Sequence, residues 1–154
     1  TFGDLTRHPE AELIPGLVIV RLDAPLYFFN ANVAKAQILK LVDDQRPAPH
    51  GVLIDLAASA DLDVTSADMV VGLVAALRDR SIEVLLAQVK GSVRDRLRRT
   101  GLMAAIGEDR IYLSIGSAAS DFQRRWPSED AARTGDAGTS APVPSGSPGG
   151  DSLP

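Results

Sequence analysis

The sequence of 154 residues contains no cysteine, and this absence excludes a disulfide framework, a cysteine-ligated zinc and a thiol nucleophile. Histidine is scarce, since His8 and His50 are the only two and lie 42 positions apart (8 to 50). Neither histidine has the helically spaced partner of a histidine-pair metal site. We therefore expect no metal site.

Long apolar segments are also missing. The longest apolar run covers 9 residues, from Met69 to Leu77, about half of the ~20 residues that span a bilayer. The N-terminus reads TFGDLTRHPEAE, without the apolar stretch of a secretory signal. Because the first residue is Thr1 and not methionine, we expect the chain to be a fragment of a longer protein.

Neither sign of charge dominates the first 126 residues, which hold 15 Lys and Arg against 16 Asp and Glu, a net charge of −1. This balance argues against nonspecific nucleic-acid binding, so we expect no nucleic-acid partner. Residues 127–154 are rich in Pro, Gly, Ser, Thr and Ala, and only Val143 and Leu153 are large and apolar. We predict one domain over 1–126 and a disordered C-terminal tail over 127–154.

Strand-like and helix-like segments alternate along the predicted domain. Apolar runs predict strands at 17–22, which is rich in β-branched residues, at 51–56, 82–89 and 111–113, and a shorter strand at 26–29. Helical spacing of apolar residues predicts helices at 30–44 (capped by Asn30), around 69–77, at 92–100 and at 117–126, with Ala118, Phe122 and Trp126 on one side of the last. Such alternation indicates an α/β fold with a partly parallel sheet, whose ligands usually bind at the carboxyl ends of the strands.

The first candidate site is the loop that joins the 51–56 strand to the next helix. Thr65 and Asp68 have the spacing of a capping box, which predicts Thr65 as a helix N-cap. A hydroxyl at a helix N-terminus is alternatively a phosphorylation site, although Asp61 and Asp63 would repel the phosphate. The regulatory candidates here are Asp63, Thr65 and Ser66.

The second candidate is the basic segment that begins at Lys90, where five cations and one anion give +4 over ten residues. Lys90, Gly91 and Ser92 come at the start of a helix and Arg94 follows, so free N–H groups and cations favour a phosphate or another anion. The full P-loop pattern is missing. A solvated basic face remains an alternative, as does contact with anionic lipid or an acidic partner.

The remaining features of the sequence give weaker indications of function. Of the adjacent aromatic residues Tyr27, Phe28 and Phe29, two are expected in the core, with an exposed docking patch as the alternative. The sequence contains no GxSxG elbow, no Cys/His pair and no HExxH motif. We therefore expect a protein that is not an enzyme and has no catalytic residues.

Four segments together resemble the STAS domain of sulfate permease (SulP) family anion transporters. They are PGLVIVRLDAPLYFFNAN at 15–32, VLIDLAASADLDVTSAD at 52–68, VLLAQVKGSVRDRLRRTGL at 84–102 and IGEDRIYLSIGSA at 106–118. They occur in the family's order and cover roughly residues 10–126. The resemblance implies the mixed, partly parallel sheet flanked by helices that this family shares with anti-sigma factor antagonists.

The resemblance also implies a function and a location. The domain would regulate a SulP-type transporter from the cytoplasmic side of the membrane, with the parent's transmembrane domain as its partner and a regulatory protein as a further one. Several members of the superfamily that the chain resembles bind GTP or ATP without efficient hydrolysis. This makes GTP, GDP or ATP the expected ligands of Thr65, Ser66, Lys90, Gly91, Ser92 and Arg94, with no cofactor required.

The antagonist branch of the superfamily gives the alternative. There a Ser in the motif D-S-S-G is phosphorylated, and Thr65 aligns with that residue in Asp63-Val64-Thr65-Ser66. Val64 and Ser66 depart from the motif, and the form D-x-T is closer to the transporter branch. The alternative function is a free-standing antagonist switched by phosphorylation of Thr65.

Overall fold

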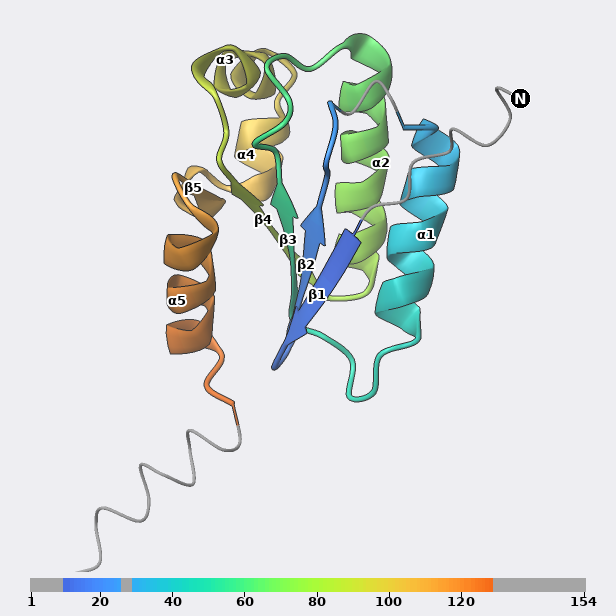
Figure 1. The fold of residues 1–154 in the computed structure, drawn as a ribbon, viewed down its shortest axis with the longest axis vertical. Helices are drawn as coiled ribbons and strands as arrows, with labels where there is room; N and C mark the ends of the chain where they lie inside the picture. Colours follow the sequence, from blue (N-terminus) through green and yellow to red (C-terminus); the bar gives the residue numbers. More distant parts are fainter. Residues whose placement is uncertain (1–9, 26–28, 129–154) are drawn as a thin grey trace, which may run out of the picture.

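A five-stranded sheet with the order β1-β2-β3-β4-β5 forms the centre of the computed structural model, which describes residues 10–25 and 29–128 (Figure 1). The strands are β1 Glu10–Ile14, β2 Leu17–Arg21, β3 Gly51–Asp55, β4 Glu83–Ala87 and β5 Ile111–Tyr112. Strands β2 to β5 run parallel, and β1 pairs antiparallel with β2. The predicted α/β fold with a partly parallel sheet is confirmed.

Helices cover both faces of this sheet, α1 and α2 on one face and α5 on the other (Figure 1). Their bounds are α1 Ala31–Asp43, α2 Val64–Asp79, α3 Gly91–Arg99, α4 Leu102–Ile106 and α5 Ile115–Arg125, with the 3-10 turn η3 at Glu108–Arg110. Asn30 caps α1 as predicted, since its side chain accepts from the Val33 N–H at 3.2 Å. Gly101, with φ +78°, follows the C-cap Thr100 of α3 in the left-handed conformation.

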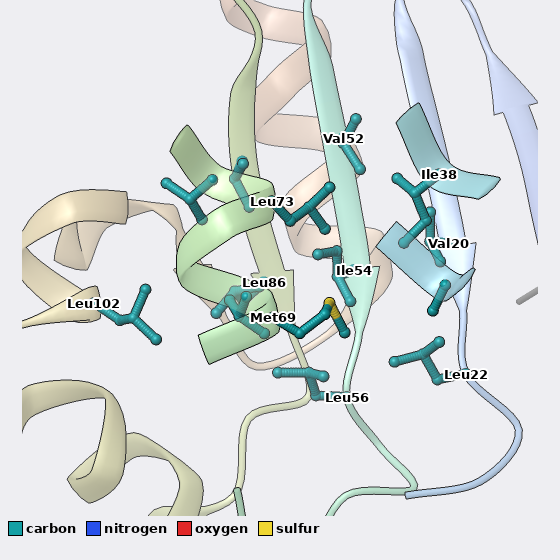
Figure 2. Close-up of a cluster of buried hydrophobic side chains, with 14 of the residues drawn as sticks. Val20, Leu22, Ile38, Val52, Ile54, Leu56, Met69, Leu73, Leu86 and Leu102 are labelled. Atoms are coloured by element: carbon teal, nitrogen blue, oxygen red, sulfur yellow. The ribbon is translucent and has the colours of Figure 1, made fainter. Parts of the chain in front are cut away.

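The central strands β2, β3 and β4 carry buried apolar residues on both sides because both faces of the sheet are covered. Val18 and Val20 point into the larger cluster with α1 and α2, part of which is drawn in Figure 2. Leu17 and Ile19, on the alternate positions, join the smaller cluster that contains Phe122 of α5. At Gly51 a Cβ atom would lie 2.7 Å from the Phe122 ring, so this close approach requires glycine.

The structure corrects several sequence-based expectations. The predicted strand at 26–29 falls mostly outside the described residues, and Phe29, which is described, is a buried bend residue. The final helix begins at Ile115 rather than 117, because Ser114 caps it through the Ser117 N–H at 3.0 Å. Trp126 follows that helix as its C-cap and is 41% exposed, so its predicted place on the helix beside Ala118 and Phe122 is wrong.

Two elements have no sequence-based prediction. Strand β1 is exposed along most of its length, so it lacks the apolar alternation that marks a half-buried strand. Helix α4 has five residues, too short for a helical period to show. Within 10–25 and 29–128, no helix combines the length and apolar character needed to cross a membrane.

Candidate functional site

The carboxyl ends of β3 and β4 meet at one edge of the sheet, and Asp55 links the loops that leave them. Its buried carboxylate accepts from the Ala57 N–H at 2.9 Å and from Gln88 Nε2 at 3.2 Å. Gln88 has φ +58°, an uncommon backbone conformation for a residue other than glycine. Asp55 thus holds together two loops that are far apart in sequence.

Asp63, and not Thr65, is the N-cap of α2. The Asp63 carboxylate accepts from the Ser66 N–H at 2.8 Å. The hydrogen bonds from Ser66, first through its side chain and then through its backbone, lower the pKa of Asp63, and the charge of Arg96 lowers it further. The predicted Thr65–Asp68 capping box is wrong, because the ionised carboxylate of Asp63 is a stronger acceptor at the start of the helix. Thr65 lies exposed in the first turn, and Ser66 is buried.

Helix α3 begins at Gly91, one residue before the predicted start, and its N-cap Lys90 makes no side-chain capping bond. The Ser92 hydroxyl donates to the carbonyl of Ala60, which fastens α3 to the loop before α2. A Cβ atom at Gly91 would meet nothing within 4 Å. Val93 and Leu97 are buried, so the cationic side chains of α3 lie on its other sides.

The two predicted segments are therefore neighbours. The Ser92 hydrogen bond and the interaction of Arg96 with Asp63 join α3 to the loop that leads into α2. Arg98 lies 3.7 Å from Asp95 and 3.9 Å from Glu108. Lys90, Arg94 and Arg99 form no ion pair with any described residue. Across the described ranges, no three His, Asp or Glu side chains gather as metal ligands would.

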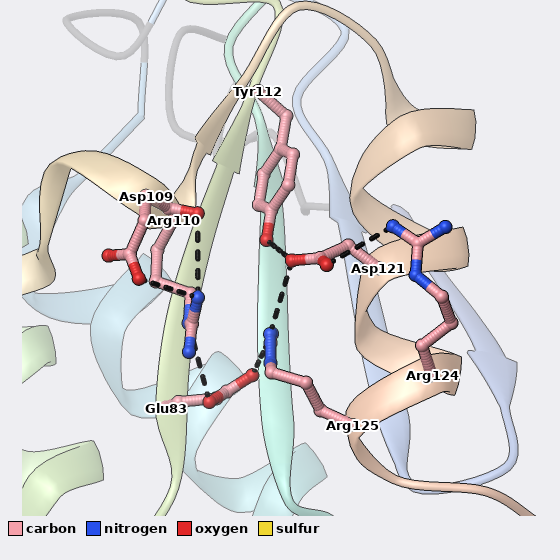
Figure 3. Close-up of polar contacts among 7 residues, drawn as sticks. All are labelled: Glu83, Asp109, Arg110, Tyr112, Asp121, Arg124 and Arg125. Atoms are coloured by element: carbon pink, nitrogen blue, oxygen red, sulfur yellow. Dashed lines mark hydrogen bonds and ion pairs between the residues drawn. The ribbon is translucent and has the colours of Figure 1, made fainter.

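A second polar cluster, which the sequence did not predict, lies between the sheet and α5 (Figure 3). Glu83 is at its centre: it lies 2.5 Å from Arg125 Nη2 and 3.6 Å from Arg110 Nε. Arg125 also contacts Asp121 at 3.3 Å, and the Tyr112 hydroxyl donates to Asp121. We call Glu83, Arg110, Tyr112, Asp121 and Arg125 the α5 network.

Burial and hydrogen bonding shift two groups of this network in opposite directions. Burial, and then the hydrogen bond to Asp121, raise the pKa of Tyr112 to about 12. The same hydrogen bond, together with that from Arg124, lowers the pKa of Asp121. The Asp121–Arg125 spacing of four residues is visible in the sequence, but Glu83 precedes Arg125 by 42 positions. The cluster therefore depends on tertiary structure.

Comparison with known proteins matches the chain to a family, and its relatives agree with that match. The sequence model of the STAS domain matches residues 8–118. A probable sulfate transporter of Mycobacterium tuberculosis is 34% identical over 122 residues, which cover 79% of this chain and 22% of that protein. The chain thus spans about a fifth of the length of this relative.

Two solved structures share the fold. The STAS domain of a SulP transporter from Vibrio cholerae has a TM-score of 0.64 and 20% identity, covering 74% of this chain and 86% of that one. A putative anti-sigma factor antagonist from Thermotoga maritima has a TM-score of 0.59 and 16% identity, covering 73% and 92%.

Proposed function

This chain belongs to the STAS domain family, and we propose that it is the cytoplasmic regulatory and interaction domain of a SulP-type sulfate or anion transporter. The observation that carries the proposal is the 34% identity to a probable sulfate transporter of which the aligned part is 22%. That proportion fits one domain attached to a larger transport protein. The proposed role is to bind and to bias the transport domain, with no bond-breaking step of its own.

Regulation of this kind requires only a difference in affinity. If the domain binds one state of the transport domain ten times more tightly than another, it shifts their equilibrium by about 1.4 kcal/mol. A ligand or modification that changes the docked surface would then change transport. The natural place for such a ligand is the edge where the β3–α2 loop and α3 are held together by Ser92 and Ala60.

We propose a nucleotide, GTP, GDP or ATP, as the ligand of this edge. Three observations support it: the start of α3 has no side-chain cap, Lys90 and Arg94 have no acidic partner among the described residues, and Thr65 is exposed nearby on α2. Backbone N–H groups and cations at a helix N-terminus suit a phosphate. Ser66 and Ser92 already form hydrogen bonds, with Asp63 and Ala60 respectively, so their proposed part is to shape the two loops.

Nucleotide titration into the isotopically labelled full chain tests the ligand. We expect the nucleotide to shift the amide resonances of Thr65–Asp68 and Lys90–Arg94. The double variant Lys90→Gln, Arg94→Gln should weaken the nucleotide affinity at least tenfold. Lys40→Gln on α1 is the matched control, because Lys40 lies outside this edge and, among residues 10–25 and 29–128, pairs with Asp44 alone. Absence of shifts at millimolar GTP, GDP and ATP would remove the nucleotide proposal and leave the transporter proposal standing.

Anion uptake by the parent protein tests the regulatory role itself. Sequencing upstream of Thr1 identifies that parent, and we expect hydrophobic spans there. Uptake should change when the domain is deleted, while the amount of parent protein in the membrane stays equal. An upstream region without such spans would overturn the transporter proposal.

The second candidate function is an anti-sigma factor antagonist switched at Thr65, and the exposure of Thr65 in the first turn of α2 favours it. Phosphate there would meet the free N–H groups of the helix. Thr65→Glu should then weaken binding to a protein kinase partner, whereas Thr65→Ala should bind and escape phosphorylation. Equal binding by both variants contradicts this switch.

A further inference from the structure

A cleft lies at the amino ends of the parallel strands, at the opposite end of the sheet from the proposed nucleotide site. Its volume is about 630 Å³. The β1–β2 turn, the segment between α1 and β3, and the end of α5 form its walls, which come together at the lower end of the molecule in Figure 1. The lining residues used below are Pro15, Arg46, Pro47, His50 and Trp126.

Two stacked rings stand in this cleft. The rings of His50 and Trp126 are 4.0 Å apart between centroids and 7° from parallel. Both residues are held by their backbones: the His50 N–H donates to the Gly16 carbonyl at 2.8 Å, and the Trp126 N–H donates to the Phe122 carbonyl at 2.8 Å. Trp126 is nevertheless 41% exposed. The indole is thus an apolar surface fixed in place before any ligand binds.

This chemistry suits a proline-rich segment in the polyproline II conformation. Such segments bind in grooves lined by aromatic rings, where proline rings pack on the rings and their carbonyls accept hydrogen bonds. The indole N–H has no acceptor among the described residues, so it is available as a donor. Pro15 and Pro47 extend the apolar wall beside it.

We propose that residues 141–148 of the same chain, APVPSGSP, bind in this cleft. The segment contains Pro142, Pro144 and Pro148, and no charged residue stands between Asp136 and Asp151. The chain leaves the fold inside the cleft, because Pro127 and Ser128 line it. Residues 129–154 lie outside the described residues, so the proposal concerns where this segment binds.

The intervening chain has a suitable length. Twelve residues, 129–140, separate the cleft from the segment, and a flexible linker of that length has an end-to-end distance of roughly 20 Å. Such a tether gives an effective concentration in the millimolar range, which is enough for a weak contact to form within one molecule. Glu129 and Asp130 follow directly in the sequence, and Arg46 lines the cleft.

The indole of Trp126 reports on this contact directly, because it is the only tryptophan in the chain. We would compare the full chain with the double variant Pro142→Ala, Pro144→Ala by the indole N–H resonance and by acrylamide quenching of fluorescence. The double variant should shift the resonance and be quenched at least twofold more readily. The matched control, Ser145→Ala with Ser147→Ala, should leave both unchanged.

A synthetic peptide of residues 139–150 supplies the second measurement. It should restore the indole resonance of the double proline variant and should bind the unmodified chain several-fold more weakly, because its own segment occupies the cleft. Equal peptide binding by both chains, or an indole resonance that is the same in all variants, would overturn the proposal. A contact that appears only as protein concentration rises would overturn it too, by showing binding between molecules.

Discussion

The α5 network and the outward-facing side of helix α3 contain similar charged residues, but the two regions differ in whether these residues have a partner of opposite charge. In the α5 network each arginine contacts a carboxylate, and Glu83 and Arg125 are only 26% and 24% exposed. On α3, by contrast, Arg94 and Arg99 have no acidic partner in the part of the chain described. Charges that are paired and shielded fix a helix to the sheet, whereas unpaired exposed charges leave a surface free to bind an anion.

Removing the apolar support of α5 should have the largest effect. Phe122 is fully buried in a cluster of seven buried residues, so Phe122→Ala should lower the free energy of unfolding by about 3–5 kcal/mol. Urea unfolding followed by circular dichroism measures this. The matched control is Leu97→Ala under α3, which should cost about 2–5 kcal/mol. A loss below 1 kcal/mol for Phe122→Ala would show that α5 is not needed for the fold.

Breaking the α5 network at its centre should have a moderate effect. Glu83→Gln leaves Arg110 and Arg125 without their shared carboxylate. Because these groups are partly exposed, we expect a loss of about 1–2 kcal/mol in urea unfolding. A double-mutant cycle with Arg125→Gln should give a coupling energy above about 0.5 kcal/mol. Additive losses would contradict the network.

The cap of α2 should contribute about 1 kcal/mol, so Asp63→Ala lowers the unfolding free energy by about that amount. Because the folded pKa of Asp63 is lowered, its contribution is full above the unfolded pKa, near 3.9, and is lost as pH falls through the folded pKa. Asp63→Asn keeps a capping oxygen and removes this titration. The unmodified chain should therefore have a higher unfolding midpoint than Asp63→Asn at pH 7 and converge with it in acid, while Asp63→Ala stays below both; curves of the unmodified chain and Asp63→Asn that stay parallel from pH 7 to pH 2 would contradict the assignment.

The unpaired cations of α3 should have the smallest effect on stability. Arg94→Gln with Arg99→Gln should change the unfolding free energy by less than about 0.5 kcal/mol, since both side chains lack an ion-pair partner among the described residues. The same variant should weaken nucleotide-induced amide shifts. A loss of stability like that of Glu83→Gln would mean that the two regions are alike after all.

The sequence predicted what local patterns determine and missed what tertiary contacts determine. The Asn30 cap of α1 follows from the local pattern at the start of one helix, and the structure confirms it. The prediction of Thr65 as the cap of α2 is wrong. The sequence shows several hydrogen-bond acceptors near the start of the helix, but not which of them accepts from its N–H groups. Glu83 with Arg125, and Ser92 with Ala60, join segments that only folding brings together. The predicted domain limits, 1–126 and 127–154, stay a prediction.

Strand β1 has a consequence for how molecules of this protein meet one another. It lies at the end of the sheet, and within the described residues its outer side has no neighbouring strand. An exposed edge strand of this kind can pair with a strand of another chain. Glu10 and Glu12 place negative charge along it, and Glu12 is held by Arg21 at 2.9 Å. Two copies that approached through β1 would bring their Glu10 side chains together, and this like-charge contact disfavours pairing through that edge.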